Sequence, residues 1–375
     1  MSRGSVVLCA ALAQRPGAGG HTWFALQYLL GFRALGWEAT LVDRLDPGMP
    51  QDGLASLAAE MERFGLEGEW SVLLPGGESA GLPRAEVERR LASCDFLLDA
   101  MGYLGDEELL ALPPLRVFLD LDPGFGQMWR QLGLADPFAG HDRFVSVGLE
   151  LGTAACEVPD CGLEWITTLP PVALAHWPAT PSGSAFTSVA TWRGPYGPVE
   201  YEGRNYGLRV HEFRRFLALP ERVPSQFELA LAIDPGDAAD RDRLQQAGWD
   251  LHDPLVVADA DSYRRFIQAS AAEFTVAKAM YVKTHSGWFS DRSACYLASA
   301  KPVVAQETGF SAHLPTGEGL LAFSTPEEAV AAVEEVCGGP ERHARAAREI
   351  ATEHFDATRV LGRLVEQLGA VRVHG

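Results

Sequence analysis

The stretch that most constrains the fold is 276–310. It holds a polar turn with a glycine at Gly287, then a small-residue apolar segment, 294–300, and then a short run rich in valine. This order predicts a loop, a helix that begins near Ser290 or Asp291, and a buried strand. The free N–H groups and the positive dipole end of such a helix attract anions, phosphate groups first among them. The stretch therefore predicts an anion-binding turn in an α/β protein.

Strand-like and helix-like segments alternate along the rest of the chain. An apolar run at 6–12 is followed by a glycine-rich loop, a segment with helical spacing of apolar residues that ends at Gly36, and a strand-like run at 37–43. This β-α-β order implies a parallel sheet with a right-handed crossover. The alternation resumes after Phe186 and includes a predicted strand at 280–283. The predicted fold class is α/β, with two consecutive parallel-sheet domains.

A Pro- and Ser-rich segment around 165–184 separates the two alternations and predicts a linker. With 375 residues, of which 47% are hydrophobic, the chain can bury the cores of two ordinary domains. We expect an N-terminal domain at 1–170, a linker at 171–185, a C-terminal domain at 186–345 and closing helices at 346–375.

Charge and composition narrow the classes of partner. The formal net charge is −19, which argues against a protein that binds nucleic acid through phosphate contacts, so we expect no nucleic-acid partner. The first apolar run is too short to span a membrane, and we expect a cytoplasmic protein without a membrane span. The six cysteines are scattered, which favours buried free thiols over a disulfide framework.

Two motifs resemble a known family. The His-x-Gly-Trp-x-Ser run at 285–290 and the Lys-Pro-Val-Val run at 301–304 resemble the nucleotide-sugar end of GT-B glycosyltransferases, in their family-1-like and family-4-like bacterial forms. The resemblance implies two Rossmann-like domains that face a cleft, with the last helix crossing back to the first domain. It also implies that a sugar moves from a nucleotide-sugar donor to a small-molecule acceptor. The donor is then a substrate, and we expect no cofactor and no metal ion.

The resemblance implies that the second domain binds the donor. Arg193 and Lys283 would be cations for the diphosphate, and Glu307 would accept hydrogen bonds from sugar hydroxyls. The predicted donor-binding residues are Arg193, Gly194, Lys283, His285, Ser286, Gly287, Ser290, Arg292, Glu307, Thr308 and Gly309.

The first β-α turn carries Gly19-Gly20-His21, which resembles the Gly-His loop where family-1-like enzymes hold a general base. A histidine titrates near neutral pH and can take a proton from an acceptor hydroxyl. It needs a carboxylate to orient its other ring nitrogen, and Asp122 and Asp99, which follow strands of the same half, are the predicted partners. The alternative interpretation is that His21 only caps or packs the first helix.

Asp120 and Asp122 also invite a metal interpretation. In strand geometry the two carboxylates would share a face, and paired carboxylates suit Mg²⁺. The pair lies far along the chain from the predicted donor turn, so we favour a role in lining the acceptor cleft and assign no metal ligand.

Two other functions stay open at this point. A GT-B-fold epimerase would bind a nucleotide sugar in the same cleft. The other is a non-catalytic nucleotide-sugar-binding protein. The family has two patterns of carboxylates in the donor helix, and this chain keeps neither. It has Ser293 at the position of the first pattern and Ala294-Cys295-Tyr296 at the position of the second. The sequence does not specify the nucleotide, the sugar, the acceptor, the stereochemical outcome or the oligomeric state.

Overall fold

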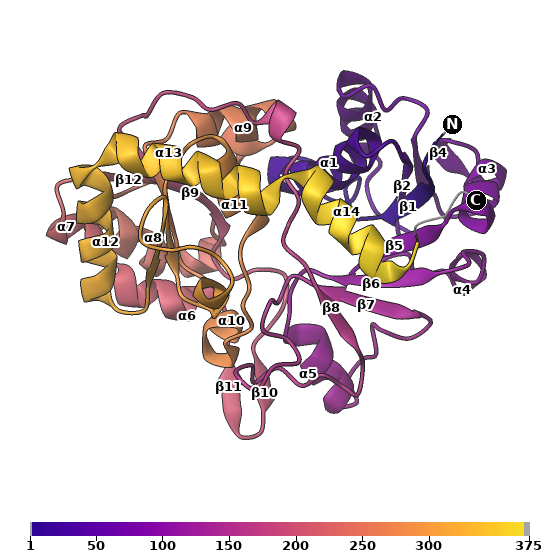
Figure 1. The fold of residues 1–375 in the computed structure, drawn as a ribbon. Coiled ribbons are helices and arrows are strands. Elements are labelled where there is room, and N and C mark those ends of the chain that lie inside the picture. The colour runs from indigo at the N-terminus through magenta and orange to yellow at the C-terminus, as the bar shows by residue number, and fades with distance from the viewer. Residues whose placement is uncertain (1, 371–375) are drawn as a thin grey trace.

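The computed structural model describes residues 2–370, which form two lobes, each built around one sheet (Figure 1). The sheet of the first lobe has the order β4-β3-β2-β1-β5-β6-β7-β8 and is parallel except for the β3–β4 pair. Its strands are β1 (Ser5–Cys9), β2 (Glu38–Arg44), β3 (Trp70–Leu73), β4 (Ser79–Gly81), β5 (Phe96–Ala100), β6 (Arg116–Asp120), β7 (Arg143–Ser146) and β8 (Trp165–Thr167).

The sheet of the second lobe has the order β13-β12-β9-β14-β15-β16, and all its strand pairs are parallel. Its strands are β9 (Ala185–Thr191), β12 (Gln226–Ala232), β13 (Trp249–His252), β14 (Ala272–Thr275), β15 (Val303–Gln306) and β16 (Leu320–Phe323). A separate antiparallel hairpin is formed by β10 (Val199–Tyr201) and β11 (Arg204–Tyr206).

Helices flank both sheets. The helices of the first lobe are α1 (Gly19–Ala34), α2 (Gly53–Arg63), α3 (Arg84–Ser93), α4 (Glu107–Leu110) and α5 (Phe125–Gln131). Those that follow are α6 (Arg209–Phe213), α7 (Leu219–Arg222), α8 (Ala238–Gln246), α9 (Ala260–Gln268), α10 (Ala279–Thr284), α11 (Asp291–Ala298), α12 (Pro326–Gly338), α13 (Pro340–Ile350) and α14 (Ala357–Leu368). Within residues 2–370, no helix is both long and apolar enough to cross a membrane.

The predicted α/β class with two parallel sheets is confirmed. The first sheet ends at Thr167 and the second begins at Ala185, so the predicted linker, 171–185, lies between them except for its last residue, which opens β9. Trp165–Thr167 is strand β8 and belongs to the first sheet, although its sequence reads as the start of the Pro-rich segment. The predicted domain boundaries stay predictions.

The strand predicted at 280–283 is wrong, because this segment lies in helix α10. A short apolar run does not distinguish a strand from a buried helical turn. The strand of this region is β14, a few residues earlier. The sequence pattern misses this strand because Ala272 and Glu273 have low β-propensity.

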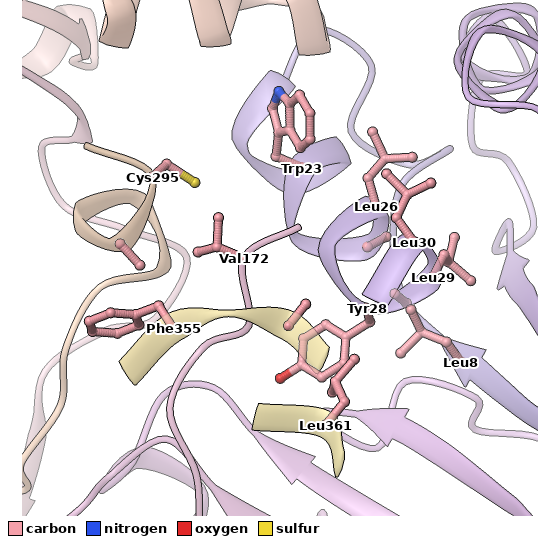
Figure 2. Packing of buried hydrophobic residues seen from close by; sticks show 14 of the residues in the cluster. Leu8, Trp23, Leu26, Tyr28, Leu29, Leu30, Val172, Cys295, Phe355 and Leu361 are labelled. Atoms are coloured by element: carbon pink, nitrogen blue, oxygen red, sulfur yellow. The ribbon is translucent and has the colours of Figure 1, made fainter. Parts of the chain in front are cut away.

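Helix α1 is the element that joins the two lobes. It is buried on almost every side, as expected for a helix that is apolar around most of its circumference. Trp23 Nε1 donates a hydrogen bond of 2.7 Å to the Ala260 carbonyl at the start of α9. In Figure 2, Val172, Cys295 and Phe355, which come from the connecting segment and the second half of the chain, lie on one side of α1, and Leu26, Leu29 and Leu30 project from its other side.

Two glycines let other elements approach α1 closely. A Cβ atom at Gly19 would lie 2.4 Å from the Asp259 carbonyl oxygen, and one at Gly31 would lie 2.7 Å from the Cβ of Ala357 in α14. Helix α14 extends from the second lobe across to α1 (Figure 1). The first turn of α1, with His21, is therefore fixed against the second lobe.

This packing predicts that Gly31→Ala destabilises the protein by about 1–3 kcal/mol, because the new methyl group overpacks the α1–α14 contact. Gly362→Ala, in α14 itself, is the matched control, since its Cβ would come no nearer than 4.0 Å to Leu35. Urea unfolding of both variants measures the difference. Equal free energies of unfolding for the two variants would show that the close approach at Gly31 does not matter.

Candidate functional site

The predicted anion-binding turn has the expected local structure. Helix α10 ends at His285, whose backbone is left-handed with φ of 49°, and α11 begins at Asp291 with Ser290 as its N-cap residue. The Ser290 hydroxyl makes no capping bond to the helix. The Asp291 carboxylate instead accepts a hydrogen bond of 2.8 Å from the Arg292 amide. The Arg292 amide is therefore already hydrogen-bonded and is not free to donate to an anionic ligand at this helix end.

A small cavity of ≈ 10 Å³, the room that one water molecule needs, lies beside the start of α11. Ser290, Ser293, Thr275 and Gln306 line its polar side. The Ser293 hydroxyl is buried and has no hydrogen-bond partner among the described residues. Ser293 therefore retains unused hydrogen-bonding capacity next to the turn.

The turn also contacts the first lobe. Ser286 accepts a hydrogen bond of 3.1 Å from the Glu150 amide, and Gly148 pairs with Trp288 as an isolated bridge. Gly287 has φ of 74°, and a Cβ atom there would lie 2.6 Å from the Glu150 nitrogen, so only glycine fits. The predicted donor turn thus contacts the first lobe through its backbone, while His285 at its start stays exposed.

The three basic residues of the predicted donor-binding set, Arg193, Lys283 and Arg292, all have partners within their own lobe. Arg193 forms a two-bond pair with Asp237 at 2.5 and 2.6 Å. Lys283 is exposed, and its Nζ donates to the Asn205 carbonyl at 2.8 Å. Arg292 lies beneath the turn. Its Nε donates to Glu273 at 2.5 Å, and its other guanidinium nitrogens donate to Thr275 and to the Val189 carbonyl.

The Glu-Thr-Gly loop after β15 is bonded to itself. Glu307 Oε1 accepts hydrogen bonds from the Thr308 amide at 2.9 Å and the Gly309 amide at 2.6 Å. These bonds occupy one oxygen of the carboxylate that was predicted to accept hydrogen bonds from sugar hydroxyls. Gly194, another residue of the predicted donor set, has φ of 90°. A Cβ atom at this position would lie 3.7 Å from Lys278 Cε.

A cation that sequence reasoning missed is Arg209, at the start of α6. Its side chain is buried, forms no ion pair among residues 2–370, and its Nε has no hydrogen-bond partner there. Desolvation, and then the nearby Arg292, lower the pKa of Arg209 to about 9, so it stays charged at neutral pH. A buried cation without a counter-ion is costly to fold around, and such groups are typical of ligand sites.

Lys278 is the second missed cation. Its Nζ lies 2.5 Å from Asp122 Oδ1 and 5.2–5.7 Å from the ring centroids of Phe125, Tyr196 and Tyr281. The Tyr281 hydroxyl donates to the same Asp122 oxygen. Asp122 and Phe125 belong to the first lobe and the others to the second. Below, "the interlobe cluster" means Asp122, Lys278, Tyr281 and Arg209.

His21 lies in the first turn of α1, and its side chain is exposed. The imidazole is nevertheless desolvated enough to change its pKa. Desolvation lowers the pKa of His21 first, and Arg15 lowers it further. Asp291, Asp122 and a hydrogen bond to the backbone of Ala11 partly oppose this shift. The imidazole is therefore influenced by both lobes, and Asp291 acts on it more strongly than Asp122.

The two predicted partner carboxylates are placed differently from each other. Asp99 is buried and is bonded to His141 Nε2 at 3.2 Å and to the Leu104 amide at 3.1 Å. It orients His141 and not His21. Asp122 is in the interlobe cluster, and its influence on His21 is electrostatic.

The expectation that Asp120 and Asp122 share one face is wrong, because β6 ends at Asp120 and the strand geometry does not continue. The Asp120 carboxylate is buried and accepts hydrogen bonds from Gln127 at 2.8 Å and Ser146 at 2.9 Å. Burial raises the pKa of Asp120 to about 6. The two carboxylates therefore do not converge on a common point.

Comparisons with known proteins bear on the fold. No protein-family model and no curated protein matches the sequence. An α-glucosyltransferase structure in complex with UDP matches with a TM-score of 0.61 and 12% identity, over 98% of this chain and 100% of that chain. AviGT4, a glycosyltransferase involved in avilamycin A biosynthesis, matches with a TM-score of 0.58 and 15% identity, over 99% of each chain.

Sucrose-phosphate synthase from Thermosynechococcus elongatus matches with a TM-score of 0.60 and 13% identity, over 98% of this chain and 100% of that chain. These likenesses extend over nearly the whole length of every chain compared. They confirm the GT-B fold that the two motifs suggested, and at such low identity they show the fold alone.

The prediction of no nucleic-acid partner is contradicted by the same comparisons. Other matched structures contain the α-glucosyltransferase with UDP-glucose and DNA carrying an abasic site, and with UDP and a 13-mer DNA carrying a central A:G mismatch. A net charge of −19 sums the whole chain, whereas binding depends on the local potential. The total charge therefore does not exclude nucleic acid for a chain of this fold.

Two buried arginines predict opposite effects on stability. Arg292→Met leaves Glu273 buried without its partner and should destabilise the protein by about 3–5 kcal/mol. Arg209→Met removes a buried cation that has no partner, and should leave the ligand-free protein at least as stable as the wild type. Urea unfolding without ligand compares the two, and equal losses would contradict the assignment of Arg209 as an unpaired charge.

Proposed function

We propose that this protein is a glycosyltransferase that moves a sugar from a nucleotide-sugar donor to an acceptor hydroxyl. The observation that carries the proposal is a pair of cations, Arg209 and Lys278, in a GT-B fold. Arg209 feels the charge of Arg292 in α11, and Lys278 follows Ala277, which lines the small cavity with Ser290 and Ser293. In an otherwise acidic chain, burying Arg209 without a partner is explained if a ligand phosphate completes the site.

In this proposal the donor diphosphate binds to Arg209, Lys278 and the N-terminal end of α11, and the Ser293 hydroxyl donates to a polar group of the donor. Arg193, Lys283 and Arg292 keep their partners and shape the loops around the donor. The two cations and the helix dipole stabilise the charge that develops on the departing diphosphate, so no divalent ion is required.

The acceptor lies on the side of the first lobe. His21 takes the proton of the acceptor hydroxyl as its oxygen bonds to the sugar C1, and the bond from C1 to the diphosphate oxygen breaks with its electron pair. The diphosphate leaves from the opposite face, which gives inversion. Desolvation and Arg15 favour the neutral imidazole of His21, which can accept a proton at neutral pH, and Asp291 and Asp122 oppose this shift only in part.

The test has a binding arm and a transfer arm. Thermal shift with UDP, GDP, ADP and dTDP identifies the nucleotide, because a bound ligand raises the unfolding temperature by mass action. Donors with that nucleotide are then offered with a panel of small hydroxylated acceptors and of DNA carrying hydroxymethylated bases, with and without EDTA. We expect a stabilising nucleotide, and transfer that EDTA does not abolish.

Each other outcome has a clear meaning. A donor sugar that is isomerised without any acceptor would make the protein an epimerase. A donor that binds but is never consumed would make it a binding protein. A protein that no nucleotide stabilises would lack the proposed donor site.

We predict that His21→Asn lowers turnover by about 10²–10⁴-fold with donor affinity nearly unchanged, because Asn cannot take the proton. The low pKa of His21 adds a pH signature. Rate should rise with pH as the imidazole loses its proton, and the midpoint of this rise should lie below about 6.5, the ordinary histidine value.

Turnover under saturating substrates measures the loss in His21→Asn, and kcat/KM from about pH 4.5 to 8 measures the midpoint, because kcat/KM reports the titration of the ligand-free protein. His354→Asn, in the segment between α13 and α14, is the matched control and should keep the wild-type profile. If His21→Asn retains more than about a tenth of wild-type turnover with chemistry rate-limiting, His21 is structural and is not the base.

A further inference from the structure

The bond between Asp122 and Lys278 joins the lobes at the proposed phosphate site. Both side chains are mostly buried, with 21% of Asp122 and 11% of Lys278 exposed. We propose that Asp122 occupies Lys278 in place of the donor diphosphate, and that donor binding moves the lysine from the carboxylate to the phosphate and frees Asp122 for the acceptor side. The inference rests on the proposed function and adds a coupling between donor and acceptor sites that the function alone does not require.

The charges of the interlobe cluster do not balance without a ligand. Two cations, Lys278 and Arg209, face one carboxylate, Asp122, which also raises the pKa of Arg209. Glu273 raises the pKa of Arg209 more strongly than Asp122 does, but Glu273 forms its ion pair with Arg292. Counting this pair adds one cation and one carboxylate, so the excess positive charge stays the same. A diphosphate carries more charge than a carboxylate and has several oxygens, so it can engage both cations together where Asp122 engages Lys278 alone.

The surroundings of Lys278 restrict where its ammonium group can go. The rings of Phe125, Tyr196 and Tyr281 surround it, and their negative faces stabilise a cation that has left its carboxylate. Tyr281 also stacks on Trp288 of the donor turn, with 4.4 Å between ring centroids and 24° between planes. The lysine is therefore held close to the donor turn whether or not it is bonded to Asp122.

Release of Lys278 changes what Asp122 does. The Tyr281 hydroxyl continues to hold the carboxylate in place, but its charge is no longer neutralised by a lysine. Desolvation and Arg15 lower the pKa of His21, and Asp122 already opposes them together with Asp291. Its effect on His21 then grows when the donor is bound. His21 therefore becomes a stronger base only after the donor has bound, so donor binding precedes activation of the acceptor.

The experiment measures competition for Lys278 directly. Calorimetry follows binding of inorganic pyrophosphate and of UDP to the wild type, Asp122→Asn, Lys278→Met and the double variant. Asn keeps the size of Asp122 and can still accept from Tyr281, so we expect Asp122→Asn to bind both probes about tenfold more tightly, a change of about 1.4 kcal/mol. Lys278→Met should bind both probes more weakly, and the double variant should match Lys278→Met.

Asp291→Asn is the matched control, because it removes another carboxylate near the helix end that has no contact with Lys278 among the described residues. Any gain from this control should persist in a Lys278→Met background, whereas the Asp122→Asn gain should vanish there. Unchanged or weaker binding by Asp122→Asn overturns the inference, and so does a gain that survives Lys278→Met.

The outcomes separate this inference from the proposed function. Sugar transfer by the wild type without tighter binding by Asp122→Asn would overturn the competition and leave the function standing. Tighter binding without transfer from any donor would do the reverse. Failure of every variant to bind either probe would overturn both.

Discussion

The rest of the structure depends on how closely helix α1 can pack. Glycines at positions 19 and 31 bring its first turn against the chain before α9 and its later turns against α14, at separations that a methyl group would prevent. The same helix covers the first sheet and contacts the second lobe through Trp23 and Gln27. One packing constraint thus builds the core between the lobes and fixes the first turn of α1, where His21 feels the charge of Asp291 in α11.

Charge is distributed unevenly about this frame. The chain is strongly acidic, yet the interlobe cluster has more cations than anions. Arg292 shows the usual solution for a buried guanidinium, with Glu273 and two further acceptors around it. Arg209 lacks such a set among the described residues. The contrast between two arginines of similar burial is what points to a missing anion, and neither total charge nor composition carries that information.

Local signals in the sequence predicted much of the fold. The start of α11 after Ser290 and the strand β15 follow from N-cap preference and apolar runs, and the Thr325–Glu328 capping box marks the start of α12. The site was predicted less well, because it depends on contacts between distant residues. Arg193 looks like a free cation until Asp237, 44 positions later, is seen to bind it. Lys278 and Arg209 carry no motif, and only the folded arrangement with Asp122 distinguishes them.

The roles of the residues that depart from the family pattern, Cys295 and Ser293, also depend on their contacts in the folded chain. Cys295, in the donor helix, is buried and accepts a hydrogen bond from Gln27 of α1 at 3.4 Å, so this position serves the contact between lobes. Ser293, two residues nearer the helix start, keeps a hydroxyl without a partner among the described residues, at the edge of the small cavity. A hydroxyl forms weaker hydrogen bonds than a carboxylate does. If the protein binds a nucleotide sugar, most of the binding free energy must then come from the diphosphate and its two cations. In such a site the affinity for the donor depends on Lys278, the same lysine that is bonded to Asp122. Donor binding and activation of the acceptor would therefore be coupled.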